Sequence, residues 1–168
     1  MAEKTEQKLI GIVMGSTSDW DIMKEAAKIC RDFEIPYETQ ALSAHRTPDE
    51  LESWIKKMEA QGCKAIVAGA GGAAHLAGVV ASKTILPVYG VPIPSKYMKG
   101  MDSLLSTVMM PKGIPVSTLA IGEAGAANAA LAVIAVLALT DEKIKNKLIA
   151  FRAKQSEKVR NAVLPELD

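Results

Sequence analysis

Residues 9–19 read LIGIVMGSTSD, and this stretch decides the fold. Its first part is an unbroken apolar run closed by Gly15, which is typical of a strand buried on both faces of a parallel sheet. From Asp19 to Phe33, apolar residues recur at helical spacing, so a helix should follow this strand directly. A buried strand that leads straight into a helix favours an α/β fold.

The same alternation continues along the chain. Further runs predict strands over Tyr37–Leu42, Ala65–Ala68, Leu86–Val91 and Val116–Ile121. A helix-start signature follows the second of the predicted strands, with Thr47 as N-cap, Pro48 at the first helical position and Glu50 three residues after the cap; this helix should stop at Gly62. We predict a three-layer α/β fold, a flavodoxin- or Rossmann-like parallel sheet with helices on both faces, in a single domain over residues 1–168.

The C-terminal third has a different pattern. Residues 124–139 form a helix with almost no polar face, and a helix that is apolar all round must be buried all round. Residues 141–163 follow as an amphipathic helix, so 141–168 is expected to be a helical arm. One small sheet can hardly cover both helices, so we expect a homo-oligomer packed through them. The alternative is a helix that is central within its own domain.

Composition limits the function classes. The 168 residues carry a formal net charge of +1, which argues against a general nucleic-acid binder, and 49% hydrophobic residues exclude a disordered chain. Cys30 and Cys63 are far apart and are expected to be reduced, buried thiols. Residues 1–8 lack the apolar stretch of a signal peptide, and no run is long enough to span a bilayer, so we expect a cytoplasmic protein without a membrane partner.

Ligands of parallel α/β sheets bind beyond the carboxyl ends of the strands, and three loops there carry suitable groups. The first loop is GSTSD, residues 15–19, in which Ser16 and Ser18 stand at a helix start that favours a phosphate. Asp19 would repel a phosphate and suits the hydroxyls of a sugar. The alternative is a helix cap without a ligand.

The second loop is SAHRT, residues 43–47. Ser43 supplies a hydroxyl, and Arg46 supplies a planar cation that can donate two hydrogen bonds to a phosphate or carboxylate. His45 is an imidazole, the group that exchanges protons near neutral pH. The alternative places His45 and Arg46 on the surface around a helix start, with no ligand.

The third loop is GAGGAAH, residues 69–75, which includes Ala70 and Gly71 and ends at the second of the chain's two histidines, His75. Its small residues expose main-chain N–H groups that can form a nest for an anion, and they leave room for a flat ligand. A metal is the less favoured ligand, because no third metal ligand is spaced near either histidine. A structural His75, bonded to the backbone, is the alternative.

Together these loops resemble one family. The segments VMGSTSDW (13–20), LSAHRTP (42–48), AGAGGAAHL (68–76), MPKGIPVSTL (110–119) and AIGEAGAANAA (120–130) are similar to those of the bacterial 5-(carboxyamino)imidazole ribonucleotide mutases of purine synthesis. The resemblance extends from Leu9 to Val159. Ala77 replaces an expected proline and Ser117 a smaller residue, but neither change removes a functional group. The Ala73-Ala74-His75 segment favours the bacterial mutase over the animal-type enzyme, which takes up carbon dioxide directly.

The resemblance implies a reaction and a role for each candidate residue. A carboxylate leaves the exocyclic nitrogen of an aminoimidazole ribonucleotide as carbon dioxide, is retained in a closed pocket, and is captured by ring carbon four. His45 would be the general acid and base, and His75 would orient the site. The other roles carried over are phosphate binding (Ser16, Ser18, Ser43, Arg46), ribose binding (Asp19), and main-chain shaping of the carbon dioxide pocket (Ala70, Gly71, Leu76). The resemblance implies no metal or other cofactor, a small nucleotide as substrate, and a homo-octamer with sites shared between chains.

Two other functions are weighed against this one. A flavodoxin-like carrier would hold a flavin phosphate at residues 16–18, but aromatic residues, only 4% of the chain, are scarce near the loops. A non-catalytic nucleotide-binding module would bind the ligand without turnover, and the presence of His45 argues against it. The loop over residues 92–100 is expected to be a mobile surface segment that covers the site, with its direction of motion left open. Transfer of substrate from a preceding enzyme is also left open.

Overall fold

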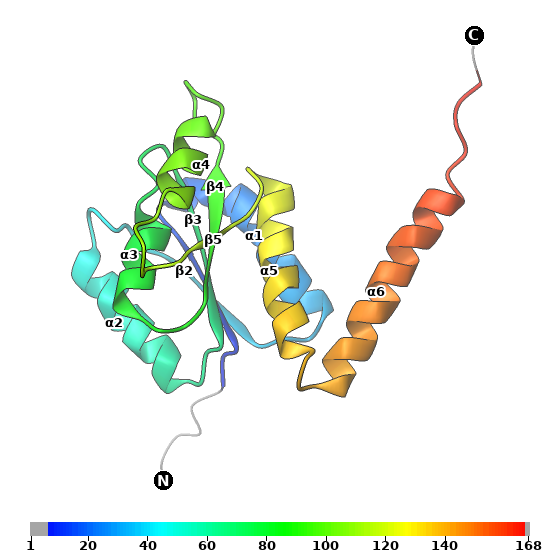
Figure 1. The fold of residues 1–168 in the computed structure, drawn as a ribbon, viewed down its shortest axis with the longest axis horizontal. Helices are drawn as coiled ribbons and strands as arrows, with labels where there is room; N and C mark the ends of the chain where they lie inside the picture. Colours follow the sequence, from blue (N-terminus) through cyan, green and yellow to red (C-terminus); the bar gives the residue numbers. More distant parts are fainter. Residues whose placement is uncertain (1–6, 167–168) are drawn as a thin grey trace. The chain divides into compact units, whose positions relative to one another are not determined.

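The computed structural model describes residues 7–166 and shows a parallel sheet of five strands in the order β2-β1-β3-β4-β5 (Figure 1). The strands are β1 (Ile10–Met14), β2 (Tyr37–Ala41), β3 (Ala65–Gly71), β4 (Val88–Ile93) and β5 (Ser117–Thr118). The helices are η1 (Thr17–Asp19, a 3-10 turn), α1 (Trp20–Asp32), α2 (Pro48–Ala60), α3 (Leu76–Lys83), α4 (Met101–Val108), α5 (Glu123–Leu137) and α6 (Glu142–Arg160). The predicted α/β class is confirmed.

Strand β1 is the buried centre of the sheet, as its apolar run predicts. All five of its residues are buried, and Ile10 pairs with Tyr37 of β2 on one side and with Ala65 of β3 on the other. Gly11 lets helix α2 approach, because a side chain there would come within 2.8 Å of Trp54. Strand β2 is an edge strand and is only partly covered. The order of these strands places the ends of β2, β1 and β3 next to one another.

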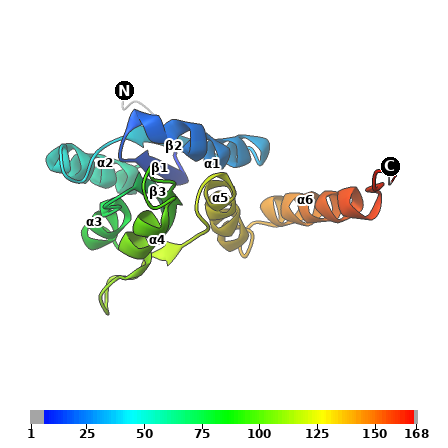
Figure 2. The same ribbon diagram turned by 90° about the horizontal axis from the view of Figure 1, so that it is seen from above.

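Helices cover both faces of the sheet (Figure 2). On one face, α2 and α3 bury an apolar core against the sheet, and α4 packs beside them on β4. The side chains that share this core include Val13, Leu51, Ile55, Met58, Ile66 and Val80. On the other face lie α1 and the part of α5 up to Leu131. The α1 contact is close, since a side chain at Gly69 would meet the sulfur of Met23 at 2.2 Å.

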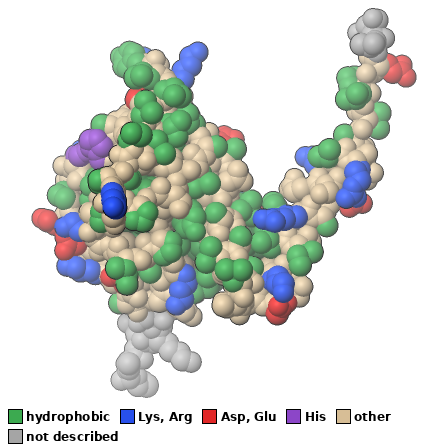
Figure 3. Space-filling model, in the orientation of Figure 1, with side chains coloured by type: hydrophobic (Ala, Val, Ile, Leu, Met, Phe, Trp, Pro, Cys, Tyr) green, Lys and Arg blue, Asp and Glu red, His purple; other side chains and the backbone are tan. Residues whose placement is uncertain are grey.

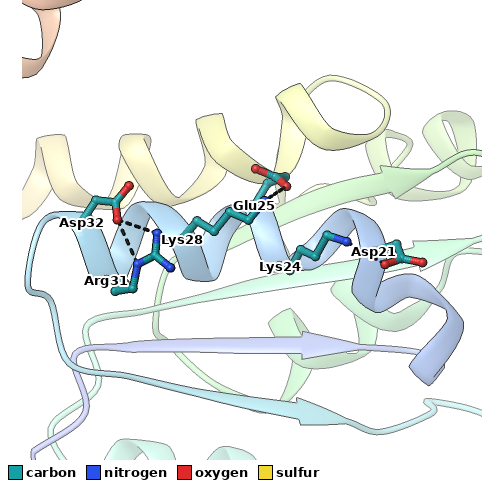
Figure 4. A network of polar contacts seen from close by, with 6 residues as sticks. All are labelled: Asp21, Lys24, Glu25, Lys28, Arg31 and Asp32. Carbon is teal, nitrogen blue, oxygen red and sulfur yellow. Dashed lines mark hydrogen bonds and ion pairs between the residues drawn. The ribbon is translucent and has the colours of Figure 1, made fainter.

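Helix α1 carries ion pairs along its exposed side (Figure 4). The pairs are Lys24–Asp21 at 2.7 Å, Lys28–Glu25 at 2.6 Å and Arg31–Asp32 at 2.9 Å. Pairs as exposed as these contribute little to stability, because water screens the two charges. Their effect is to keep one side of the helix polar while its buried residues, Met23, Ala26, Ala27 and Cys30, face the core.

Three predicted boundaries are wrong. Strand β3 extends to Gly71, so the first residues of the glycine-rich loop belong to the sheet. Strand β4 begins at Val88 and takes in Pro92. The carbonyl of Pro92 accepts a hydrogen bond from the N–H of Gly122, on the side of β4 where β5 lies. The nitrogen and the carbonyl of one strand residue point to the same side, so the nitrogen of Pro92 also faces the β5 side. Strand β5 pairs only with Tyr89 and Gly90 of β4, so this pairing has ended before Pro92. The N–H that a proline lacks is therefore not needed for a strand pair at this position.

Two further elements differ from the sequence reading. Strand β5 is limited to Ser117–Thr118 within the predicted range 116–121. Helix α4 follows Gly100 and was not predicted. Its buried side includes two hydroxyl side chains, Ser103 and Thr107, which interrupt the apolar spacing that reveals a helix in a sequence.

The described residues divide into two compact units after Leu131. In the second unit, α6 is capped by Asp141, whose carboxylate accepts hydrogen bonds from the N–H groups of Lys143 and Ile144. Although α5 is as apolar as predicted, Val136 is 51% exposed in the single chain. A single domain with an arm from residue 141 stays a prediction, and residues 1–6, 167 and 168 lie outside the described part. Among residues 7–166, no helix combines the length and apolar character that crossing a membrane requires.

Candidate active site

A cavity of about 470 Å³ lies at the carboxyl ends of β1, β2 and β3. Nine of the ten predicted site residues line it, and the tenth, His75, contacts one of them. The predicted residues in the lining are Ser16, Ser18, Asp19, Ser43, His45, Arg46, Ala70, Gly71 and Leu76. The sequence reading missed three lining residues at the end of β4 and just after it, namely Ile93, Pro94 and Ser95. The sequence indicated them only through their position, since they fall in the segment over residues 92–100 that was expected to cover the site.

The first loop is a tight turn held by its own serines. The Ser16 hydroxyl accepts hydrogen bonds from the Ser18 N–H at 3.3 Å and from the Ser18 hydroxyl at 2.9 Å. Ser16 therefore caps η1, and α1 begins four residues further on at Trp20. Gly15 continues the sheet through its N–H bond to the carbonyl of Gly69, and its φ is not in the left-handed region. The turn presents two hydroxyls to the cavity.

Asp19 is a partly buried carboxylate at the edge of the cavity. Burial raises its pKa above the ordinary value, while hydrogen bonds from Ser16 and Ser18 and the charge of Arg46 oppose the rise. A carboxylate that loses contact with water on folding is stabilised by hydroxyl groups that donate hydrogen bonds to it. This environment suits hydrogen bonds from the hydroxyls of a ligand.

Ser43 organises the second loop. Its hydroxyl accepts hydrogen bonds from the N–H groups of His45 at 3.3 Å and Arg46 at 3.2 Å, and from Arg46 Nε at 3.3 Å. Thr47 turns its hydroxyl back toward this loop, accepting from the Ser43 N–H at 2.8 Å and donating to the Ser43 carbonyl at 3.1 Å. Helix α2 does start at Pro48, but Thr47 makes no side-chain cap bond, so the predicted capping box is wrong.

Arg46 joins the first and second loops. Its Nη2 donates to the carbonyl of Gly15 at 3.1 Å, while Nε contacts Ser43. A guanidinium carries five N–H donors, so these contacts leave others for a ligand. The side chain is thus held in place as a fixed cation beside the two serines of the first loop.

The two histidines are in direct contact. His45 Nε2 and His75 Nδ1 are 2.9 Å apart, and the rings meet edge to face with centroids 5.0 Å apart. Both side chains are exposed and reach the surface in Figure 3, where histidine is purple. One ring donates a hydrogen to the other, and which ring is the donor depends on their tautomers. Within residues 7–166, no three His, Cys, Asp or Glu side chains are grouped so that they could hold a metal ion.

The third loop is less open than its sequence indicates. The N–H of Gly72 donates to the Ser103 hydroxyl at 2.9 Å, and the N–H groups of Ala74 and His75 donate to carbonyls within the loop. These three donors are already used, so they do not form the predicted anion nest. Gly72 has φ +68, a left-handed conformation that favours glycine. Its role is to turn the chain from β3 toward α3.

Comparison with known proteins identifies relatives over most of the chain. A protein of Vibrio parahaemolyticus named N5-carboxyaminoimidazole ribonucleotide mutase is 55% identical over 150 residues, covering 89% of this chain and 93% of that protein. The bifunctional purine synthesis protein purC/E of Dictyostelium discoideum is 54% identical over 153 residues, covering 91% of this chain and 15% of that protein. The resemblance noted in the three loops is confirmed.

A solved structure supports the same relationship. The crystal structure of Treponema denticola PurE aligns with a TM-score of 0.83 at 28% identity, covering 91% of this chain and 94% of that one. The predicted fold class is confirmed by this likeness. The description AIR carboxylase applies to the family that matches residues 9–158. With a family match over nearly the whole described chain and relatives more than half identical, the chain belongs to the AIR carboxylase family.

Proposed function

We propose that the chain is a mutase that converts 5-(carboxyamino)imidazole ribonucleotide to 4-carboxy-5-aminoimidazole ribonucleotide in purine synthesis. The observation that carries the proposal is one cavity in which an imidazole, a fixed guanidinium, two serine hydroxyls and a carboxylate converge in a chain of this family. Two of the relatives described above, the mutase and the purine synthesis protein, have names that point to the same reaction and pathway. The reaction only moves a carboxylate within one molecule, so the enzyme is an isomerase.

The substrate is proposed to bind with its phosphate at the first and second loops. Ser16, Ser18 and Ser43 offer hydroxyls, and Arg46 offers the N–H donors that Gly15 and Ser43 do not occupy. Asp19 then accepts hydrogen bonds from the ribose. This arrangement places the imidazole ring of the substrate toward the third loop, where Ala70, Gly71 and Leu76 form a wall without bulky polar groups.

His45 is proposed as the acid and base. The bond between the exocyclic nitrogen and the carboxylate breaks, its electron pair stays on nitrogen, and the nitrogen takes a proton from His45. Ring carbon four then attacks the released carbon dioxide, and His45 takes the proton that this carbon loses. Atoms, electrons and protons balance within one turnover, and the imidazole is regenerated.

His75 is proposed to orient His45 through their 2.9 Å contact. A hydrogen donated by one ring selects which nitrogen of the other is free to exchange a proton. The contact joins the second and third loops, which are 30 residues apart in the chain. His75 therefore acts on the reaction through His45.

A homo-oligomer, an octamer as the family implies, is proposed to close the site. In the single chain His45, Arg46, Gly71 and Ala73 are exposed, so carbon dioxide held there would escape. Exposed apolar side chains also lie on α4 and on the segments directly before and after it, in a region that is green in Figure 3. Those side chains are Tyr97, Met98, Met101, Leu105, Val108 and Met109. We place the oligomer in the cytoplasm, where purine synthesis takes place.

The test is incubation of the purified chain with the carboxyamino substrate. Loss of acid-labile carbon together with a gain in absorbance from the ring-carboxylated product supports the proposal. Binding without turnover favours the non-catalytic module, and a yellow protein that releases flavin favours the carrier. Either outcome refutes the mutase assignment.

A further inference from the structure

Ser103 lies outside the cavity and yet holds one of its walls. It is fully buried, at 0% exposure, on helix α4. Its hydroxyl accepts a hydrogen bond from the N–H of Gly72 at 2.9 Å and donates one to the carbonyl of Ile93 at 2.7 Å. A hydroxyl has one hydrogen, so the two contacts use it once as donor and once as acceptor. Since Gly72 and Ile93 both line the cavity, Ser103 ties two lining segments together.

The turn at Gly72 depends on this support from α4. A side chain at Gly72 would meet no atom within 4 Å, so nothing packs against the turn from its Cα side to hold it in shape. Its carbonyl accepts from the Ala74 N–H at 2.9 Å, and it lies 3.1 Å from the Ser106 hydroxyl, whose one hydrogen is shared between this carbonyl and that of Asp102. Its N–H, in contrast, has Ser103 as its partner. The two peptide groups that meet at Gly72 therefore contact two serines one helical turn apart, Ser103 through the N–H and Ser106 through the carbonyl.

We propose that Ser103 is a positioning residue that keeps the carbon dioxide pocket closed during the reaction. The inference rests on the proposed function. Carbon dioxide is uncharged and cannot be held by an ion pair, so only the position of the surrounding walls retains it. The Gly71–Gly72–Ala73 turn is such a wall, and it leads through Ala74 to His75 and its contact with His45.

Loss of the Ser103 hydroxyl should loosen this wall without touching substrate. Ser103→Ala leaves the Gly72 N–H and the Ile93 carbonyl without their partner in a buried place, and such groups rearrange toward water. If the wall moves after the first step, carbon dioxide diffuses away. The substrate then ends as 5-aminoimidazole ribonucleotide, whose exocyclic nitrogen has kept the proton from His45, and water returns a proton to His45.

The experiment measures how turnover divides between two products. The intact enzyme and its variants are incubated with the carboxyamino substrate, and the ring-carboxylated product and the decarboxylated amine are quantified side by side. For Ser103→Ala we expect the share of amine to rise about tenfold or more, since a misplacement of about 1 Å in an active site already costs about a hundredfold in productive reaction. The amine formed in a parallel incubation without enzyme is subtracted, because the substrate also loses carbon dioxide uncatalysed. After this subtraction, a loss of folded protein alone lowers both products equally, so the ratio separates positioning from stability.

Thr107→Val is the matched control. Thr107 is buried at 3% exposure on the same helix, and its hydroxyl donates to the Ser103 carbonyl, at 2.7 Å, and not to the third loop. We expect an unchanged product ratio for this variant. Ser106→Ala is the second test variant, because it removes a hydroxyl that the Gly72 carbonyl shares with the Asp102 carbonyl while Ser103 stays in place. A smaller rise in the amine is expected there.

Each result has a defined meaning. A rise in the amine with Ser103→Ala, and not with Thr107→Val, supports the inference. If Ser103→Ala does not fold, the ratio in Ser106→Ala decides. If the parent enzyme is active and the variants give the same ratio of amine to ring-carboxylated product, the role of Ser103 is overturned while the proposed function stands. If the parent forms no ring-carboxylated product, the proposed function fails and this inference fails with it.

Discussion

Replacing Arg46 by Lys tests whether the guanidinium holds the phosphate of the substrate. In the structure its Nη2 donates to the Gly15 carbonyl at 3.1 Å and its Nε to the Ser43 hydroxyl at 3.3 Å. Five N–H donors less these two leave three for a ligand, arranged in a plane. A lysine ammonium has three donors at one point, so if it keeps both loop contacts it has one donor left. Arg46→Lys therefore keeps the charge and loses the two-pronged contact.

The size of the effect follows from one charge-assisted hydrogen bond. Such a bond contributes about 1.5–3 kcal/mol. Because about 1.4 kcal/mol corresponds to a factor of ten, the Michaelis constant should rise about 10- to 150-fold. The turnover number should change much less, since the reacting atoms lie at the imidazole and not at the phosphate.

Steady-state kinetics with the carboxyamino substrate measures the Michaelis constant and the turnover number, and calorimetric titration with the product measures binding directly. Arg31→Lys is the matched control, because Arg31 is 68% exposed, pairs with Asp32 on α1 and does not line the cavity. It should behave as the parent does. An unaltered Michaelis constant in Arg46→Lys, or a fall in turnover alone, would refute the phosphate role.

Three further predictions concern the site and the core. His45→Asn should lower turnover by about two orders of magnitude or more with unchanged thermal stability, because the side chain is exposed; stopped assays and a melting curve check this, and activity within a few-fold of the parent contradicts it. Asp19→Asn should raise Tm at neutral pH and weaken substrate binding. Burial raises the pKa of Asp19, so its ionisation costs stability above the folded pKa, and the gain in Tm should vanish as pH falls below the ordinary value of 3.8; a lower Tm at pH 7 goes against it. Gly125→Ala should cost about 3 kcal/mol or more in chemical denaturation, because its Cβ would lie 1.7 Å from the Ala120 carbonyl oxygen, whereas Gly78→Ala, which meets only the flexible Met110 side chain at 3.0 Å, should be nearly neutral; equal costs would show that the Ala120 contact is not decisive.

Local chemistry made much of the fold predictable. The unbroken run of β1 and the spacing of α1 depend on residues close in sequence, and both elements lie where they were expected. The start of α2 at Pro48 was also predicted, because proline at a first helical position needs no partner outside the helix. The predicted side-chain cap at Thr47 is wrong, since its hydroxyl bonds to the backbone of Ser43, a contact that the bend of the loop decides.

Features that depend on contacts between residues far apart in the chain could not be predicted from the sequence. Pro92 was expected to end a strand, and it lies inside β4 because the neighbouring strand has already ended on the side that its nitrogen faces. Helix α4 was missed because two of its buried positions carry hydroxyls, Ser103 and Thr107, and their partners became visible only in the folded chain. Nothing in the local pattern marks such a serine as a core residue.

The sequence by itself determined the candidate residues: hydroxyls at a helix start, an arginine and two histidines, each in a loop that follows a predicted strand. Only the tertiary structure decided that they meet. The strand order β2-β1-β3 puts the loops after these strands side by side, so His45 and His75 approach to 2.9 Å across 30 residues of chain. The physical reason is that spacing along the chain sets the side chains and the type of element, whereas hydrogen bonding between strands sets which loops are neighbours.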